Sequence, residues 1–436
     1  MAIQPTEYYI KNILGEYEPV HFKTDAGLVK VEDSGGFFSK DNAEEVLGEV
    51  GASLAEISQI MADQFPTSYP FNLTIKEDIV FKHTDGTPLV FRTYCPVNKC
   101  LYATIGWGGV LRSDDKGASW SITKRFQQDT TPKYPRDMFT SKTGAVFVVC
   151  AVGTIDSTDY RLYRSTDKGV NWTEVLAFTG QLNILGYGAA EHPTWGLYIA
   201  EYKMDNDAVP YVYLHRSTDD GATWAIAKQW NHVKLGTGAE DIRHMHFVQY
   251  DPYENCMWAG TGDEDSQCRL YKSTDGSTWT IFGSGTQKWR AVSILFDKTY
   301  IYMPTDAVFT TADRGAVYRI HRTTKVIEKI GNMTSLSWYS TTLADGKQIA
   351  ISTVQTEALD NYVKIWDIDY TGVKEVARWQ ATPNCPLANI QRIYQDADDP
   401  TVLYANFIFL PMLGVAGLAN GMGIRLMLKE VRPFSS

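Results

Sequence analysis

The sequence predicts an all-β protein that is built from repeated units of four strands each. The eight-residue pattern Ser-x-Asp-x-Gly-x-x-Trp occurs three times in full and once with one residue fewer, and its serines are 52, 52 and 56 residues apart (113 to 165 to 217 to 273). Copies at a nearly constant spacing indicate a repeat architecture. Strand-forming runs precede the copies, for example at 161–164, 213–216 and 269–272. The 25 tyrosines, 18 phenylalanines and 12 tryptophans also suit β-structure.

The composition restricts the class of protein. With 44% hydrophobic and 21% charged residues among 436, the chain has the balance of an ordinary globular protein. A net charge of −10 argues against nucleic acid as a partner. Residues 1–7 contain neither a basic region nor an apolar core, and no run of 18 apolar residues follows, so we expect neither a signal peptide nor membrane insertion. The six cysteines, at 95, 100, 150, 256, 268 and 385, lack metal-ligand spacing and are expected to be reduced.

Residues 1–70 are predicted to form a separate N-terminal segment. Residues 1–40 have no strong periodicity and are expected to hold short strands and loops. A helix is predicted at about 42–62, with Asp41 or Asn42 as its N-cap. Its apolar residues follow a heptad spacing: Leu47, Val50, Leu54, Ile57 and Met61. This helix either lies on the main domain or forms a short trimeric coiled coil. The proline-containing stretch 64–70 then marks a boundary before the main domain, 71–436.

The repeated pattern has the chemistry of a hairpin turn. Aspartate and serine oxygens accept backbone N–H groups across a turn, glycine adopts the positive φ of a tight reversal, and tryptophan begins the return strand with a large apolar face. The residues of the four copies are Ser113, Asp115, Gly117, Trp120, Ser165, Asp167, Gly169, Trp172, Ser217, Asp219, Gly221, Trp224, Ser273, Asp275, Gly276 and Trp279.

This pattern resembles the Asp-box, or BNR repeat, of sialidases, xyloglucanases and sortilin-like receptors. The resemblance implies a β-propeller in which the motif lies on the outer hairpin of each blade and has a structural role. Seven units can be traced, beginning near Leu89, Met138, Ile184, His244, Ala291, Leu336 and Ile390. Six blades remain the alternative if the irregular seventh unit is an appendage.

The seventh unit contains only three strands, and residues 73–81 supply a spare strand before the first unit. Closing a propeller with a strand from the opposite end of the domain removes an exposed sheet edge. We therefore predict that residues 73–81 pair with residues 424–430.

A second resemblance concerns residues 31–51, which begin Val-Glu-Asp-Ser-Gly-Gly-Phe-Phe and continue through Asn42-Ala43-Glu44 into the predicted helix. The segment is similar to one near the N-terminus of phage tail fibre and baseplate proteins, from which it departs at Ala43 and Val46. The resemblance implies a virion protein that is made in the bacterial cytoplasm without a signal peptide, attaches to other tail proteins through residues 1–40, and is a homotrimer.

Candidate ligand-binding residues lie where the first strand of a unit begins and where the second strand ends, because both connections emerge on the face opposite the repeated turns. Aromatic faces, arginines and carboxylates are the groups that bind a pyranose ring and its hydroxyls. The predicted set is Trp107, Arg136, Asp137, Glu201, Tyr202, Arg243, His244, His246, Asp263, Trp289, Arg290 and Asp306. The alternative is a lattice of ion pairs that holds the inner strands.

Catalysis is a further alternative. A glycoside hydrolase needs two carboxylates across the scissile bond, and the candidates are Asp137, Glu201, Asp263 and Asp306. Arg136, Arg243 and Arg290 superficially supply the arginine triad of a sialidase, but the Arg-Ile-Pro motif of that family is absent and no tyrosine is marked as the nucleophile.

His244 and His246 share one face of a strand, which allows either a metal site or a hydrogen-bonded channel lining. We predict no cofactor and no metal. The favoured hypothesis is a phage tail receptor-binding protein that recognises a host cell-surface glycan, ahead of a hydrolase and of a purely structural tail component.

Overall fold

The computed structural model describes residues 8–11, 17–23, 28–31, 37–38, 72–105, 108–178, 182–183, 187–203, 210–233, 238, 241–307, 312–354, 360–382, 387–411, 415–419 and 421–431. The chain divides into two compact units, Met1–Phe71 and Asn72–Ser436. The first unit contains one antiparallel sheet, in the order β1 (Tyr8–Lys11), β2 (Tyr17–Lys23), β3 (Leu28–Val31) and β4 (Phe37–Phe38). The predicted helix at 42–62 lies outside the described residues.

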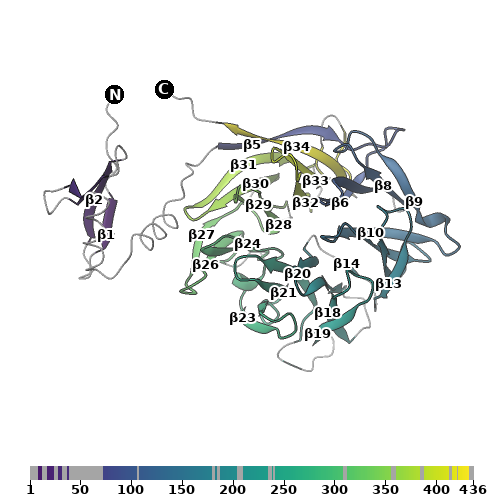
Figure 1. Cartoon of the computed structure of the whole chain (residues 1–436), viewed down its shortest axis with the longest axis horizontal. Helices are drawn as coiled ribbons and strands as arrows, with labels where there is room; N and C mark the ends of the chain where they lie inside the picture. Colours follow the sequence, from purple (N-terminus) through teal and green to yellow (C-terminus); the bar gives the residue numbers. More distant parts are fainter. Residues whose placement is uncertain are drawn as a thin grey trace. The chain divides into compact units, whose positions relative to one another are not determined.

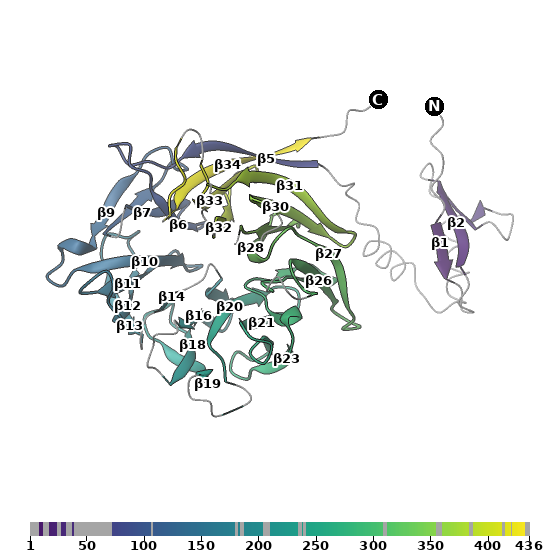
Figure 2. The same ribbon diagram turned by 180° about the vertical axis from the view of Figure 1, so that it is seen from behind.

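The second unit is a seven-bladed β-propeller, which confirms the predicted fold class (Figures 1 and 2). Each blade is a four-stranded antiparallel sheet whose first strand lines the central channel. Blades 1 to 3 are β6 (Val90–Cys95), β7 (Cys100–Ile105), β8 (Gly109–Ser113), β9 (Ser121–Arg125); β10 (Lys133–Thr140), β11 (Val146–Val152), β12 (Tyr160–Ser165), β13 (Thr173–Ala177); and β15 (Ala189–His192), β16 (Gly196–Ala200), β18 (Tyr211–Ser217), β19 (Ala225–Asn231).

Blades 4 to 6 continue the ring with the same strand order. They are β20 (His244–Asp251), β21 (Cys256–Gly262), β22 (Arg269–Ser273), β23 (Thr280–Ser284); β24 (Leu295–Phe296), β25 (Tyr300–Pro304), β26 (Ala316–His321), β27 (Ile327–Asn332); and β28 (Ser337–Thr342), β29 (Gln348–Ser352), β30 (Tyr362–Asp369), β31 (Gly372–Gln380). Three predicted starts need correction. The first strands of blades 2 and 5 begin at Lys133 and Leu295 rather than near Met138 and Ala291. The first strand of blade 3 begins at Ala189 rather than near Ile184. The preceding strand β14 (Leu182–Asn183) pairs instead with β17 (Tyr202–Lys203), in the connection between the second and third strands.

Blade 7 closes the ring as predicted. It contains β32 (Asn389–Gln395), β33 (Val402–Ile408) and β34 (Met422–Val431), and its outer strand is β5 (Asn72–Val80) from the start of the unit. The register runs antiparallel from Ile424 opposite Val80 to Val431 opposite Asn72. The two ends of the propeller sequence therefore share one sheet, so neither forms an unpaired edge.

The described helices are short 3-10 turns, η2 (Phe126–Gln128) and η4 (Gln287–Trp289), and no α-helix occurs among these residues. Within this part of the chain, no helix has the length and hydropathy of a membrane span. The five described cysteines are free thiols, as predicted. Cys95 and Cys100 face each other in register across the β6–β7 hairpin.

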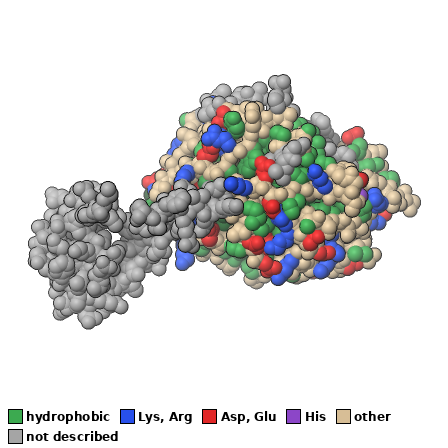
Figure 3. Space-filling view, turned by 90° about the horizontal axis from the view of Figure 1, so that it is seen from above, with side chains coloured by type: hydrophobic (Ala, Val, Ile, Leu, Met, Phe, Trp, Pro, Cys, Tyr) green, Lys and Arg blue, Asp and Glu red, His purple; other side chains and the backbone are tan. Residues whose placement is uncertain are grey.

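The core lies between neighbouring blades rather than in one central mass. At the junction of blades 7 and 1, Phe81 packs with Phe91, Trp120 and Tyr404, at ring-centroid distances of 5.9, 5.1 and 6.4 Å. All four side chains are buried. Burial of one such side chain contributes about 1.5–3 kcal/mol, so the aromatic contacts between sheets hold adjacent blades together. On the side of the molecule that Figure 3 shows, positive and negative side chains are mixed.

The hydrogen bonds of the repeated turn explain each residue of its pattern. Ser113 Oγ accepts the Gly117 N–H at 2.8 Å and donates to Asp115 Oδ1 at 2.7 Å. Asp115 Oδ1 also accepts the Ser119 N–H at 2.8 Å, and Trp120 Nε1 donates to the Gly117 carbonyl at 3.1 Å. Gly117 has φ +85°, and a Cβ there would lie 2.2 Å from the Phe81 ring. The polar groups of the turn therefore find almost all of their hydrogen-bond partners within the same eight residues.

An arginine of the third strand joins each of several blades to the next. Arg112 donates to the Lys168 carbonyl at 3.3 Å, and Arg164 donates to the Asp220 carbonyl at 2.8 Å. The other links of this kind among the described residues are Arg216 to Gly276, Arg319 to Tyr370 and Arg425 to Lys116. Each acceptor lies in the turn between the third and fourth strands of the following blade. We call this set the arginine clasps.

Candidate functional site at the channel mouth

In blade 4, the strand pairing places the repeated turn and the predicted ligand-binding residues at opposite ends of the sheet. In blade 4, His244 pairs with Gly262 at one end of the sheet, while Asp251 pairs with Cys256 at the other end. Ser273, which begins the turn, pairs with Met257 and so lies at the Asp251 end. We call that end the turn face and the opposite end the channel mouth. This separation is the arrangement predicted from the connections.

Asp263 is the centre of a charged cluster at the channel mouth. Its Oδ2 lies 2.6 Å from Arg243 Nη1 and 3.4 Å from His244 Nε2. Its Oδ1 lies 3.0 Å from Arg290 Nη2 and 3.3 Å from His246 Nε2. Asp263 follows β21, His244 and His246 belong to β20, and both arginines precede first strands. One carboxylate therefore gathers four basic side chains from blades 4 and 5.

Arg290 connects Asp263 to a second carboxylate. Its Nε lies 3.0 Å from Asp306 Oδ2, so the same guanidinium bridges both aspartates. Trp338 Nε1 donates to Asp306 Oδ1 at 2.8 Å and brings blade 6 into the cluster. Asp306 follows β25 and is buried. Trp338 was missed by the sequence reasoning, although it occupies the start of the first strand of its blade, the position at which Arg243 and Arg290 were found.

Tyr202 and the two histidines form the aromatic part of the cluster. The Tyr202 ring stacks on the His244 ring with centroids 3.8 Å apart and planes at 19°. Nδ1 of His244 lies 3.2 Å from the Lys203 carbonyl oxygen, and Nδ1 of His246 lies 3.0 Å from that of Ala291. We call Tyr202, Arg243, His244, His246, Asp263, Arg290, Asp306 and Trp338 the mouth cluster.

The two aspartates of the mouth cluster have pKa values that are shifted in opposite directions. Burial alone would raise the pKa of Asp263, but its contacts with the surrounding basic side chains, first of all His244 and His246, outweigh burial and hold the pKa well below its usual range. Burial raises the pKa of Asp306, against the opposing charge of Arg290. Burial lowers the pKa of His244. Asp263 is therefore the carboxylate that stays ionised, and Asp306 is the one that protonates more readily.

Other predicted residues lie in separate environments. Glu201 is fully buried, with Oε1 2.9 Å from His215 Nε2 and Oε2 3.2 Å from Lys203 Nζ. Trp289 lies in η4 within the core of blades 4 and 5, where a Cβ on Gly283 would be 2.3 Å from its ring. Trp107 lies outside the described residues.

Asp137 and Arg136 belong to a second cluster, between blades 1, 2 and 7. Asp137 Oδ2 lies 2.5 Å from Arg392 Nη2, and Arg392 Nη1 donates to the Arg92 and Met138 carbonyls at 3.1 and 3.3 Å. Arg136 donates to the Ile155 carbonyl. Burial lowers the pKa of Arg92 to about 10, helped by the charge of Arg392. Sequence reasoning missed Arg392, whose unit carries none of the repeated turns.

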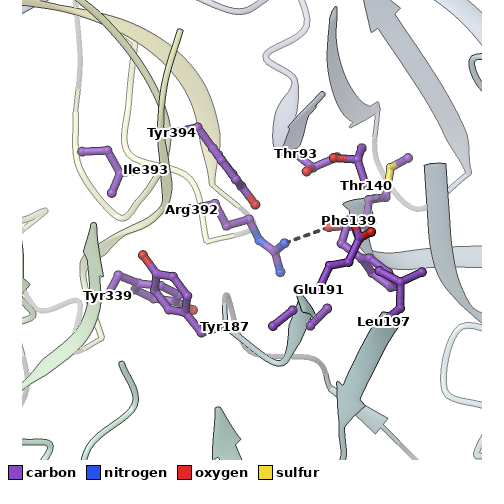
Figure 4. Close-up of a pocket in the computed structure, with 13 residues that line it drawn as sticks. Thr93, Phe139, Thr140, Tyr187, Glu191, Leu197, Tyr339, Arg392, Ile393 and Tyr394 are labelled. Atoms are coloured by element: carbon purple, nitrogen blue, oxygen red, sulfur yellow. Dashed lines mark hydrogen bonds between the residues drawn. The ribbon is translucent and has the colours of Figure 1, made fainter. Parts of the chain in front are cut away.

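A cavity inside the channel is lined by this arginine (Figure 4). Figure 4 shows Arg392 near the middle of the lining residues, with Tyr187 and Tyr339 on one side and Phe139 and Glu191 on the other, around a space of about 190 Å³. A second cavity of about 340 Å³ shares Tyr187, Ala189 and Ala190 with the first and reaches Tyr250 and Phe296.

Comparisons with known proteins give no close sequence match. No family model matches the sequence, and no curated protein sequence matches it. Among solved structures, a GH74 enzyme of Niastella koreensis is 16% identical with a TM-score of 0.48, over 80% of this chain and 56% of that one. YCF48 bound to D1 peptide is 11% identical with a TM-score of 0.47, over 84% of this chain and 99% of that one.

A protein of unknown function from Dyadobacter fermentans is likewise 11% identical with a TM-score of 0.47, over 84% of this chain and all of that one (100%). The chain thus spans just over half of the GH74 enzyme. At these identities the likeness concerns the β-propeller fold alone.

Proposed function

We propose that the protein binds carbohydrate at the mouth cluster and acts as a phage tail receptor-binding protein that recognises a host cell-surface glycan. The observation that carries the proposal is the convergence of planar hydrogen-bonding groups and aromatic rings from four successive blades at one end of the channel. Tyr202 comes from blade 3, Arg243 and Asp263 from blade 4, Arg290 from blade 5 and Trp338 from blade 6.

The chemistry of these groups suits a sugar ring. Guanidinium and carboxylate groups exchange paired hydrogen bonds with vicinal hydroxyls, while aromatic faces pack against ring C–H groups. Among the ion-paired residues of the mouth cluster, Arg243 is the most accessible. Its side chain is 35% exposed, against 16% for Asp263 and 14% for Arg290. A glycan would therefore contact Arg243 first and reach Asp263 behind it.

The placement in a phage tail rests on the resemblance of residues 31–51 to tail fibre and baseplate proteins. On this proposal the N-terminal segment, through residues 1–40, attaches the propeller to other tail proteins, and the protein is a homotrimer in the virion. Solution mass measured by light scattering tests the trimer, and a monomer would contradict it.

Adhesion of the purified protein to whole host cells tests the glycan-binding site. We expect binding of the wild type and at least a tenfold loss in a Tyr202→Ala, Arg243→Ala double variant, because stacking and charge-assisted hydrogen bonds are both removed. Arg112→Ala is the matched control, since Arg112 is also paired with a carboxylate but lies on the turn face. Unaltered adhesion in the double variant would overturn the choice of face. A wild type that binds neither cells nor glycans would indicate a structural tail component.

The opposed pKa shifts of Asp263 and Asp306 favour a second candidate, a glycoside hydrolase. Such an enzyme needs one carboxyl that donates a proton and one that stays ionised, and separate environments commonly set these roles. Release of sugar from host polysaccharide, lost in both Asp263→Asn and Asp306→Asn, would establish this activity. Adhesion without sugar release would exclude it.

A further inference from the structure

The two histidines of β20 face hydrogen-bond acceptors at both ring nitrogens. Nδ1 of each ring lies against a backbone carbonyl, at 3.2 Å for His244 and 3.0 Å for His246. Nε2 of each ring lies against the Asp263 carboxylate, at 3.4 and 3.3 Å. A neutral imidazole carries a single N–H. Each neutral ring therefore turns one nitrogen lone pair toward an oxygen.

The carbonyl contacts indicate which nitrogen carries the proton. A backbone carbonyl only accepts hydrogen bonds, so Nδ1 donates and Nε2 presents its lone pair to Asp263. Among the described residues, Nε2 of His244 has no hydrogen-bond partner, although His244 is only 2% exposed. An Nδ1–H to carbonyl hydrogen bond is also the arrangement by which proteins orient a histidine that binds metal through Nε2.

We propose that His244, His246 and Asp263 bind a divalent transition-metal ion of the zinc type through the two Nε2 atoms and the carboxylate. Zinc–ligand bonds of about 2.0–2.2 Å in a tetrahedron imply ligand-to-ligand distances of about 3.3–3.5 Å. His244 Nε2 lies 3.4 Å from Oδ2 of Asp263, and His246 Nε2 lies 3.3 Å from Oδ1, so each nitrogen is near this distance from one oxygen of the carboxylate. One ligand atom from each of the three residues lies within 4.8 Å of the others. The three ligand atoms would draw closer together around an ion.

The donor set selects the metal. Two imidazole nitrogens and one carboxylate suit Zn²⁺ and its late first-row neighbours, whereas Ca²⁺ and Mg²⁺ favour oxygen ligands throughout. Three protein ligands leave a fourth position for water or a bound group. This is the pattern of zinc sites that exchange a ligand, rather than of closed structural sites.

The surrounding charge selects the fourth ligand. The charges of Arg243 and Arg290 balance those of Asp263 and Asp306, so a divalent ion brings the cluster to a net charge of about +2. Arg290 retains Asp306 as a partner at 3.0 Å, and the half-exposed Arg243 can turn toward solvent. The site therefore favours an anionic fourth ligand, such as hydroxide or a carboxylate. The proposal stands independently of carbohydrate recognition.

Metal binding is measured on the untagged full chain after treatment with a chelator and dialysis. Titration with ZnCl₂ in a calorimeter should show one equivalent bound, and titration with CoCl₂ should give the strong visible absorption of tetrahedral cobalt. We expect the zinc affinity to fall at least tenfold in His246→Gln and in Asp263→Asn. His215→Gln is the matched control, because His215 is also buried against a carboxylate, that of Glu201, but has no second histidine beside it.

Three results would overturn the proposal. The first is that the wild type takes up no stoichiometric zinc or cobalt. The second is that a His246→Gln, Asp263→Asn double variant keeps its affinity for zinc. The third is that nitrogen NMR shifts show both imidazole rings doubly protonated at neutral pH. Circular dichroism and the melting temperature identify a variant that fails to fold, and the wild-type cobalt spectrum decides the question without any variant. Cell adhesion is scored separately in chelator, so failure of glycan binding is distinguished from failure of metal binding.

Discussion

The two faces of the propeller use charged residues in opposite ways. On the turn face, the carboxylate of each repeated turn is satisfied within its own hairpin, as Asp167 is by the Asn171 N–H at 2.8 Å and the Ser165 hydroxyl at 2.8 Å. At the channel mouth, Asp263 is shared by four basic groups from two blades. The comparison teaches that the carboxylates of the repeated turns are satisfied at short range, whereas the carboxylate at the centre of the candidate binding site gathers basic groups from two blades.

The largest expected effect concerns a buried ion pair on the turn face. Arg322 of blade 5 makes two hydrogen bonds to Asp251 of blade 4, at 2.6 and 3.1 Å, and both side chains are buried. Arg322→Ala leaves that carboxylate unpaired, so we expect a loss of about 3–5 kcal/mol in the free energy of unfolding, measured with urea. The control Arg319→Ala removes an exposed clasp of the same blade and should cost about 1 kcal/mol or less. Equal losses would break the distinction between buried and exposed links.

The next effect concerns the glycine of a repeated turn. Gly221 has φ +81°, and a Cβ there would lie 2.4 Å from the Phe147 ring. Gly221→Val therefore combines backbone strain with overpacking, and we expect a loss of about 3 kcal/mol in the free energy of unfolding. Gly285→Ala is the control, because Gly285 has φ +89° but nothing within 4 Å of a Cβ. A similar loss of stability in both variants would show that the positive φ alone accounts for the glycine, and that the close contact between blades does not contribute.

Low pH should lower the free energy of unfolding by protonating the carboxylates of the repeated turns. Backbone hydrogen bonding from Asn171 lowers the pKa of Asp167 to about 2, and hydrogen bonding from Thr223 lowers the pKa of Asp219 to about 2, both from 3.8. Because the folded pKa values lie below the unfolded ones, this stability is fully present above about pH 4 and is lost as the pH falls toward 2.

Urea unfolding between pH 2 and 6 measures this effect. The Asp167→Asn, Asp219→Asn double variant should have a shallower loss of stability below pH 4 than the wild type. Thr166→Ala, a substitution in the same turn that keeps both carboxylates, should leave the slope unchanged. Identical slopes in the double variant and the wild type would contradict the claim that hydrogen bonds within each turn to its own aspartate stabilise the turn face.

The smallest effect on stability is expected at the channel mouth. Arg243 is half-exposed, so Arg243→Ala should change the free energy of unfolding by about 1 kcal/mol or less. The same variant should bind host cells about tenfold to a hundredfold more weakly, because a charged hydrogen bond contributes about 1.5–3 kcal/mol. A large loss of stability would instead identify Arg243 as a structural residue and remove the contrast between the faces.

The fold was predictable because its signals are local. Each repeated turn is specified within eight residues, and the count of strands in blade 7 required the strand at 73–81 to close the ring. The arginine clasps were visible as a basic residue before Ser113, Ser165 and Ser217, but the sequence alone does not say that their carbonyl acceptors lie one blade further on.

The candidate site was predictable only in part. Arg243, Asp263 and Arg290 were found from their positions at the ends of strands, and the structure brings them together. Glu201 and Trp289 occupy equivalent positions, yet their side chains turn into the core, because the direction of a side chain in an irregular connection depends on packing between blades. Trp338 occupies the same position as Arg290 but was not selected, and Arg392 lies inside β32 rather than at the end of a strand.

Hydrogen–deuterium exchange measured with and without host surface polysaccharide tests the division of roles between the two faces most directly. The account predicts that the polysaccharide slows exchange in peptides that cover 201–203, 243–246 and 289–290, and leaves the turns at 113–120, 165–172 and 217–224 unchanged. Slower exchange confined to those turns, with no change at the channel mouth, would contradict it.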